Sequence, residues 1–180
     1  MFKYGSMRHF FVKLFFGLLT TIFSLVYLGS LLTYNVNDPG FKTFSNTGQV
    51  LEISNYFGSF GSYLSSYSLV IVGELSYVIG IFMLVEGFKS SMGIKSPFLI
   101  LRFVLNFFGV LLLGMFIFSH NFIPINAGLI SIFLSNLIYG YLYSGFDNNI
   151  LVYISNIFIL VFGIIFILFS FLIKYSFIKK

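Results

Sequence analysis

The chain has 180 residues, of which 58% are hydrophobic and only 8% are charged, and its formal net charge is +5 at pH 7. An ordinary soluble domain carries about 25% charged residues, so this composition excludes a soluble fold and predicts an all-α integral membrane protein. The ten Lys and Arg residues form no stripe that could follow nucleic-acid phosphates, and the absence of cysteine excludes disulfides, thiolate nucleophiles and cysteine-bound metals.

Four apolar stretches are long enough to cross a membrane, because about 20 helical residues span a hydrocarbon core of about 30 Å. We expect spans over about residues 14–34, 63–85, 98–118 and 150–173. The first stretch is too long for a cleaved signal peptide, and no Ala-x-Ala site follows it. Residues 1–13 and 174–180 are expected to be cytoplasmic segments that flank a membrane domain of residues 14–173.

A fifth apolar stretch, residues 127–143, is expected not to cross the membrane. Lys and Arg accumulate on the cytoplasmic side of membrane proteins. Here they gather in three clusters: Lys3, Arg8 and Lys13; Lys89, Lys95 and Arg102; and Lys174, Lys179 and Lys180. Four crossings place all three clusters in the cytoplasm with both termini, whereas a fifth would place the last cluster outside. We therefore expect residues 127–143 to form a re-entrant or interfacial helix on the outer side, so the fold is a four-transmembrane-helix bundle with one extra helix.

Small residues are expected to let the helices pack closely, because lipid removes most of the hydrophobic drive for helix association. In the second span Ser59, Ser66, Gly73, Gly80 and Gly87 recur at every seventh residue. Gly17 with Ser24, and Gly163 with Ser170, repeat this spacing in the first and fourth spans. The pattern predicts one helix face held against a neighbour.

Glu74 is the one carboxylate expected deep inside a span, at a depth similar to that of Asn106 and Ser24. Hydrogen bonds among these three residues would give Glu74 a structural or oligomer-holding role. The alternative is a small transporter or channel subunit in which Glu74, Asn106 and Asn156 line a wet path. A structural subunit of a larger membrane complex is a third possibility.

The remaining charged residues indicate ordinary helix-end chemistry. Glu86 and Lys89 can pair on one helix face, and Arg102 is expected to extend to the inner lipid headgroups. His9 and His120 are too far apart in the expected topology to share a metal. The sequence has no catalytic triad, no paired carboxylates and no phosphate-binding loop, so we expect no catalytic residue, no metal and no cofactor.

The segment after the first span, residues 32–41, has the sequence Leu-Thr-Tyr-Asn-Val-Asn-Asp-Pro-Gly-Phe. It contains an Asn-x-x-Asp-Pro pattern that begins at Asn35. Asp38 is expected to accept hydrogen bonds from the backbone, while Pro39 sets a turn and Gly40 adopts positive φ. The pattern predicts a sharp bend as the chain leaves the membrane.

A second pattern, Asn55-x-x-Gly58-x-x-Gly61, opens the second span, which continues through Gly73 and Gly80. Asn55 is expected to cap a short helical approach, and the glycines permit close contact between backbones.

The order of these features resembles the N-terminal four-helix membrane domain of FtsK/SpoIIIE-type bacterial DNA translocases, over about residues 14–173. That family carries a similar Asn-x-x-Asp-Pro turn, a Gly-x-x-Gly start to the second span, and a Gly-containing apolar outer segment, here from Asn126-Ala127-Gly128 onward. The chain departs from the family at Gly40-Phe41, where a small residue and Trp are frequent. It departs also at Gly80, where proline is frequent, and at the single Gly128, where paired glycines are common.

The resemblance implies a membrane anchor in the bacterial inner membrane at the division septum. Such an anchor forms homo-oligomers, contacts other cell-division proteins and tethers an ATP-driven DNA motor that acts in chromosome partition. No motor sequence is present, so we expect this chain not to be an enzyme and not to bind DNA or ATP itself. A fragment, a split gene and a stand-alone anchor with a separately encoded motor are equally compatible with the sequence.

Overall fold

A computed structural model describes residues 4–41, 52–94, 96–119, 127–145 and 149–172. The regular structure in these ranges is helical throughout, which confirms the all-α prediction. The elements are α1 (Tyr4–Leu32), α2 (Gly58–Ile71), α3 (Ser76–Ser91), α4 (Leu99–Ser119), α5 (Leu129–Gly145) and α6 (Asn149–Leu172).

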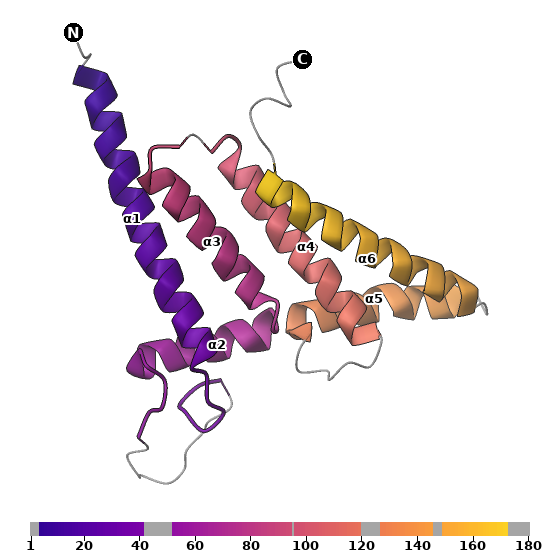
Figure 1. Ribbon diagram of the computed structural model, residues 1–180. Coiled ribbons are helices and arrows are strands. Elements are labelled where there is room, and N and C mark those ends of the chain that lie inside the picture. Colours follow the sequence, from indigo (N-terminus) through magenta and orange to yellow (C-terminus); the bar gives the residue numbers. More distant parts are fainter. Residues whose placement is uncertain (1–3, 42–51, 95, 120–126, 146–148, 173–180) are drawn as a thin grey trace, which may run out of the picture.

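The helices form two adjacent pairs with two further helices across one end (Figure 1). α1 packs along α3, α4 packs along α6, and a smaller contact between α3 and α4 joins the pairs. α2 and α5 lie across the lower end of the view in Figure 1, while the start of α1, the α3–α4 connection and the end of α6 lie at the upper end. Of the Lys and Arg residues that the sequence places on one side of the membrane, the described ones, Arg8, Lys13, Lys89 and Arg102, therefore lie toward one end of the bundle.

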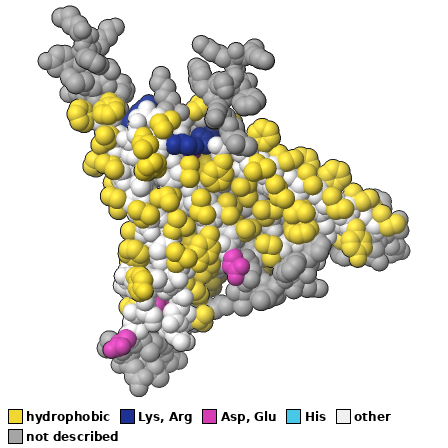
Figure 2. All heavy atoms as spheres, viewed as in Figure 1, with side chains coloured by type: hydrophobic (Ala, Val, Ile, Leu, Met, Phe, Trp, Pro, Cys, Tyr) yellow, Lys and Arg dark blue, Asp and Glu magenta, His cyan; other side chains and the backbone are white. Residues whose placement is uncertain are grey.

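Three helical segments are long and apolar enough to cross a membrane: Phe10–Leu32, Leu99–Ser119 and Ile150–Phe171. α2 and α3 together meet the same criterion as a bent pair, which gives up to four crossings within the described residues. Apolar side chains cover most of the described surface visible in Figure 2, as expected for helices that face lipid. α5 is a shorter apolar helix, as expected for the extra segment at residues 127–143.

The prediction of one continuous helix over residues 63–85 is wrong, because α2 and α3 meet at an angle of 117°. α2 ends where Gly73 adopts a φ of 87°, a left-handed conformation that commonly terminates helices. Ser76 Oγ donates to the carbonyls of Ser68 and Gly73 and fixes the bend. α3, with 16 residues and a length of about 24 Å, is the limb that runs beside α1. Glu74 is exposed at the bend and does not lie inside a continuous helix.

The expected seam of small residues is confirmed only for Gly80 and Gly87, where α3 packs on α1; Ser59 and Ser66 lie in α2, and Gly73 lies at the bend. A Cβ atom at Gly87 would lie 2.8 Å from the Thr21 nitrogen, and one at Gly80 would lie 2.5 Å from a Leu28 methyl carbon. Gly163 plays the same part in α6, since its carbonyl oxygen would lie 3.0 Å from a Cβ atom at Gly109 in α4. Because glycine carries no side chain, α3 can approach α1 closely at these positions, and α6 can approach α4.

Candidate functional site

Asp38 organises the first of two polar clusters, in the loop between α1 and α2. Its carboxylate is buried and accepts hydrogen bonds from two backbone amides, Ser54 N to Oδ1 and Asn55 N to Oδ2, both at 2.9 Å. The prediction that Asp38 accepts from the backbone is confirmed, and its donors lie in the segment just before α2. A carboxylate with two amide donors makes charge-assisted hydrogen bonds, which are stronger than neutral ones.

Asn55 joins the end of α1 to the start of α2. Its Nδ2 donates to the carbonyls of Ser30 at 2.9 Å and Thr33 at 3.3 Å, and its Oδ1 accepts from Phe57 N at 3.1 Å. The last carbonyls of a helix have no partner within the helix, so the amide of Asn55 satisfies groups that α1 leaves open. The expected capping role is only partly right, because Asn55 Oδ1 accepts from the amide of Phe57, but the N-cap residue of α2 is Phe57 itself. Asn55 in addition ties α1 to the start of α2.

The Pro39-Gly40 turn packs against the serine face of α2. Ser62 Oγ donates to the carbonyl of Pro39, and Ser66 Oγ accepts from Phe41 N at 2.9 Å. Gly40 does not adopt the expected positive φ. A glycine is needed here for lack of space, because a Cβ atom at this position would lie 2.5 Å from Ser66 Oγ.

The other residues of the two sequence patterns lie around this cluster. Asn35 Oδ1 accepts from Asn37 N at 3.0 Å, and Asn35 Nδ2 donates to Ser54 Oγ at 3.2 Å. Gly61 is buried where a Cβ atom would overlap Asn55 Oδ1, and Gly58 begins α2 with a φ of 61°. The structure thus brings both halves of the pattern, 35–40 and 55–61, into one contact.

Gly73 and Gly128 meet where the α2–α3 bend touches the start of α5. Gly128 has a φ of 75°, and a Cβ atom there would lie 2.5 Å from Gly73 N and would overlap the Val72 carbonyl carbon. The two glycines are 55 positions apart in the sequence numbering. Their contact holds α2 and α5 together as one platform, here called the end platform (α2, α5 and the 38–41 turn).

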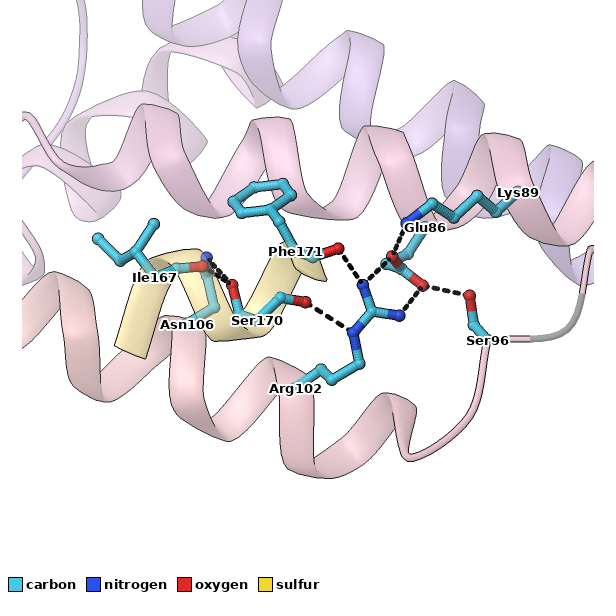
Figure 3. Close-up of polar contacts among 8 residues, drawn as sticks. All are labelled: Glu86, Lys89, Ser96, Arg102, Asn106, Ile167, Ser170 and Phe171. Carbon is cyan, nitrogen blue, oxygen red and sulfur yellow. Dashed lines mark hydrogen bonds and ion pairs between the residues drawn. The ribbon is translucent and has the colours of Figure 1, made fainter. Parts of the chain in front are cut away.

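The second polar cluster, here called the inner junction, lies among α3, α4 and α6 at the opposite end of the bundle (Figure 3). Arg102 forms a two-point ion pair with Glu86, with Nη2 to Oε1 at 2.7 Å and Nη1 to Oε2 at 3.1 Å. Lys89 Nζ lies 2.9 Å from Glu86 Oε1, which confirms the expected Glu86–Lys89 pair, and Ser96 Oγ donates to Glu86 Oε2. The Glu86 carboxylate thus accepts from three side chains.

The prediction that Arg102 extends to the lipid headgroups is wrong, because the residue is buried, with 1% of its surface exposed. Its Nε donates to the Ser170 carbonyl at 2.6 Å and its Nη2 to the Phe171 carbonyl at 3.4 Å. α6 ends at Leu172, so these carbonyls belong to its last turn, where a helix is partly negative and its oxygens need donors. The guanidinium also lies 5.9 Å from the centre of the Phe82 ring. A planar group with five donors suits this set of partners better than an ammonium would.

The expected grouping of Glu74 with Asn106 and Ser24 is wrong. Asn106 Nδ2 donates to Ser170 Oγ at 3.1 Å, and Ser24 Oγ donates to the Thr21 carbonyl at 2.9 Å. Asn156 accepts from the Tyr139 hydroxyl, which ties α6 to α5. Glu74, Asn106 and Asn156 therefore have separate surroundings and do not form the polar file that a transport path requires.

Both clusters join helices and place their polar groups against one another. Among the residues that the structure describes, no group of three or more His, Cys, Asp or Glu side chains could hold a metal ion. Sequence reasoning missed the inner junction, although one signal was present: Glu86 and Arg102 are opposite charges that flank a short connection between two apolar helices. The arrangement is suited to fixing helix positions in a membrane.

Comparison with protein families gives one match. The model of the 4TM region of DNA translocase FtsK/SpoIIIE matches residues 11–179, from within α1 to beyond the end of α6. No curated protein and no solved structure gives a significant match.

Proposed function

This chain belongs to the family of 4TM regions of FtsK/SpoIIIE DNA translocases, and on that premise we propose that it anchors a translocase of this kind at the division septum. The observation that carries the proposal is the family match over residues 11–179, which covers the described membrane-spanning segments except for Phe10 at the start of the first. The chain would act in cell division and chromosome partition through helix packing and protein contacts. The family describes the membrane region and not the ATPase motor, so the motor would be supplied by other residues or by another chain.

The proposed orientation in the inner membrane has both termini in the cytoplasm and the inner junction at the cytoplasmic end of the helix bundle. It is supported by the positions of Lys13 and Lys89, which lie together because Ser90 Oγ donates to the Lys13 carbonyl at 3.2 Å. Lys and Arg favour the cytoplasmic side of short membrane-protein loops. In this orientation the end platform faces outward.

Oligomerisation is supported by the uneven burial of the spans. In the apolar stretch of α4, 39% is buried within the chain, compared with 17% in the apolar stretch of α1 and 11% in that of α6. α4 is therefore the central helix, and α1 and α6 offer long apolar faces to lipid or to other copies of the chain.

Division partners would meet the chain at the end platform. Phe60, Tyr63 and Tyr67 are exposed on α2, and the rings of Tyr63 and Tyr67 stack with their centres 6.3 Å apart. Such aromatic side chains are enriched at protein interfaces, where they bury a large area at low entropic cost.

The experiment that tests the proposal is imaging of the full chain in dividing bacteria, with a fluorescent protein that matures only in the cytoplasm fused to its C-terminus. The expected result is a bright band at midcell. Uniform fluorescence around the cell would contradict septal targeting, and absence of fluorescence despite good expression would contradict the cytoplasmic C-terminus.

A pair of variants would locate the partner surface. Replacing both Tyr63 and Tyr67 with Ala should weaken the midcell band while leaving the amount of protein in the membrane unchanged. Replacing Tyr153, which is 68% exposed on α6, is the matched control and should leave the band intact. Equal effects of the two changes would argue against a partner surface on α2.

A further inference from the structure

A groove of about 360 Å³ opens between α1, α3 and α4 beside the inner junction. Its walls are almost entirely apolar and come from all three helices: Phe16, Thr20, Phe82, Met83, Leu99 and Phe103. The volume lies in the range of small-molecule sites, about 300–1,000 Å³. An apolar groove of this volume can hold part of one acyl chain.

One end of the groove is polar, and basic residues lie beside that end without lining the groove itself. Glu86 and Ser90 line it together with the apolar residues. Glu86 carries one negative charge, whereas Arg102, Lys89 and Lys13 carry three positive charges, which leaves a formal net charge of +2. Figure 2 shows Lys and Arg side chains gathered at the upper end of the apolar face.

The two lysines are placed to meet a ligand at the membrane surface. Ser90 lines the groove, and its hydroxyl donates to the Lys13 carbonyl, so Lys13 of α1 and Lys89 of α3 lie at the same end of it. The Lys13 residue is exposed, and the Lys89 side chain is 30% exposed. Arg102 and Lys89 share the single negative charge of Glu86, so the three basic side chains around this end keep a net positive charge for a further anion.

We propose that this groove binds an anionic phospholipid, with an acyl chain between α1, α3 and α4 and the headgroup phosphate between Lys13 and Lys89. Basic pockets between transmembrane helices bind anionic headgroups at the cytoplasmic face of other membrane proteins. The apolar walls and the +2 end match the two parts of such a lipid. The bound lipid would fill the space between the helix pairs beside the limited contact of α3 with α4, and so stabilise their relative position.

The test is native mass spectrometry of the full chain in detergent, titrated with phosphatidylglycerol or with phosphatidylcholine of the same acyl chains. The wild-type chain should bind phosphatidylglycerol with clear preference. Each lysine near a membrane surface contributes about fivefold to the affinity for anionic lipid. Lys13→Gln, which leaves the Glu86 contacts in place, should therefore raise the Kd for phosphatidylglycerol about fivefold, and the double variant with Lys89→Gln should raise it further.

Two further variants separate headgroup from acyl-chain binding. Lys42→Gln removes the same charge from the segment between α1 and α2 and should leave both affinities unchanged. Met83→Trp narrows the groove and should weaken the binding of both lipids by a similar factor. Gel filtration and circular dichroism check that this variant is folded.

Three results would overturn the proposal. The first is equal binding of the two lipids by the wild-type chain, and the second is unchanged phosphatidylglycerol affinity in the double lysine variant. The third is a change in the number of chains per particle on Met83→Trp with lipid affinity unchanged, which would show that a second copy occupies the groove.

Discussion

The guanidinium of Arg102 in α4 forms a two-point ion pair with the carboxylate of Glu86 in α3, with Nη2 2.7 Å from Oε1 and Nη1 3.1 Å from Oε2. The same guanidinium donates to the carbonyls of Ser170 and Phe171 in α6. One side chain thus connects three helices. Because α3 packs along α1, this contact joins the α1–α3 pair to the α4–α6 pair.

Replacing Arg102 with Met should destabilise the fold by about 3 kcal/mol, at the low end of the cost of breaking a buried pair, because Lys89 stays beside the carboxylate. The measurement is equilibrium unfolding in detergent micelles, followed by circular dichroism. Lys89→Met is the control, and it should cost at most about 1 kcal/mol because this lysine is partly solvated. Wild-type stability in Arg102→Met would show that the inner junction does not hold the helix pairs together.

Replacing both Glu86 and Arg102 with Met should recover part of the stability that Arg102→Met loses. In the double variant Glu86→Met with Arg102→Met no uncompensated carboxylate remains, so it should unfold at a higher denaturant concentration than Arg102→Met alone. A double variant less stable than Arg102→Met would contradict this explanation.

Asp38→Asn should loosen the loop before α2. The amide has one acceptor oxygen in place of two, so one of the amides of Ser54 and Asn55 loses its partner, at a cost of about 1.5–3 kcal/mol. Hydrogen exchange should show faster exchange of these two amides by at least about tenfold. Asn37→Ala, at an exposed position in the same loop, is the control and should leave their exchange unchanged. Unchanged exchange in Asp38→Asn would exclude the carboxylate as their main acceptor.

Gly128→Ala should disrupt the end platform, because the new methyl group would overlap the Val72 backbone and the residue would keep a φ of 75°. The left-handed conformation alone costs a non-glycine residue about 1–3 kcal/mol. Gly140→Ala is the matched control within α5, where a Cβ atom has no neighbour within 4 Å. It should be neutral or stabilise the chain by up to about 1 kcal/mol. Thermal unfolding in detergent distinguishes the two, and equal midpoints would contradict the close contact between Gly128 and the bend.

Glu74→Gln should change the free energy of unfolding by less than about 0.5 kcal/mol, because Glu74 is exposed at the α2–α3 bend. The midcell band of the fluorescent fusion should also persist. If vesicles that contain the wild-type chain showed a proton or ion flux, and vesicles that contain Glu74→Gln lacked it, the transporter alternative would be supported instead.

The helices could be predicted from composition and length, whereas their interruptions could not. The predicted spans at residues 14–34, 98–118 and 150–173 correspond approximately to α1, α4 and α6. A run of about 20 apolar residues is typical of a membrane-spanning helix, so these three could be recognised from length and composition. Residues 63–85 also have the hydropathy of a span, and hydropathy does not register that Gly73 takes a left-handed conformation. For this reason Glu74 was expected inside a continuous helix, whereas it lies at the bend.

The polar clusters were predictable only where partners are local. Glu86 and Lys89, three residues apart on one helix, were recognisable from spacing. The ion pair of Glu86 with Arg102 spans 16 residues and depends on how α3 and α4 pack, so spacing alone left Arg102 assigned to the headgroups. In the same way the Asp38 and Asn55 patterns were recognised separately, and only the fold shows that they bond to each other.

In the membrane anchor that we propose, the inner junction and the end platform lie toward opposite sides of the bilayer. The chain has no cysteine, so single cysteines can report on each side without further changes. Tyr56→Cys beside α2, Asn136→Cys in α5 and Met92→Cys after α3 all replace exposed residues. With a membrane-impermeant maleimide, the first two should be labelled in intact spheroplasts and Met92→Cys only after permeabilisation. Labelling of Met92→Cys from outside, or of Tyr56→Cys and Asn136→Cys from different sides, would contradict the account.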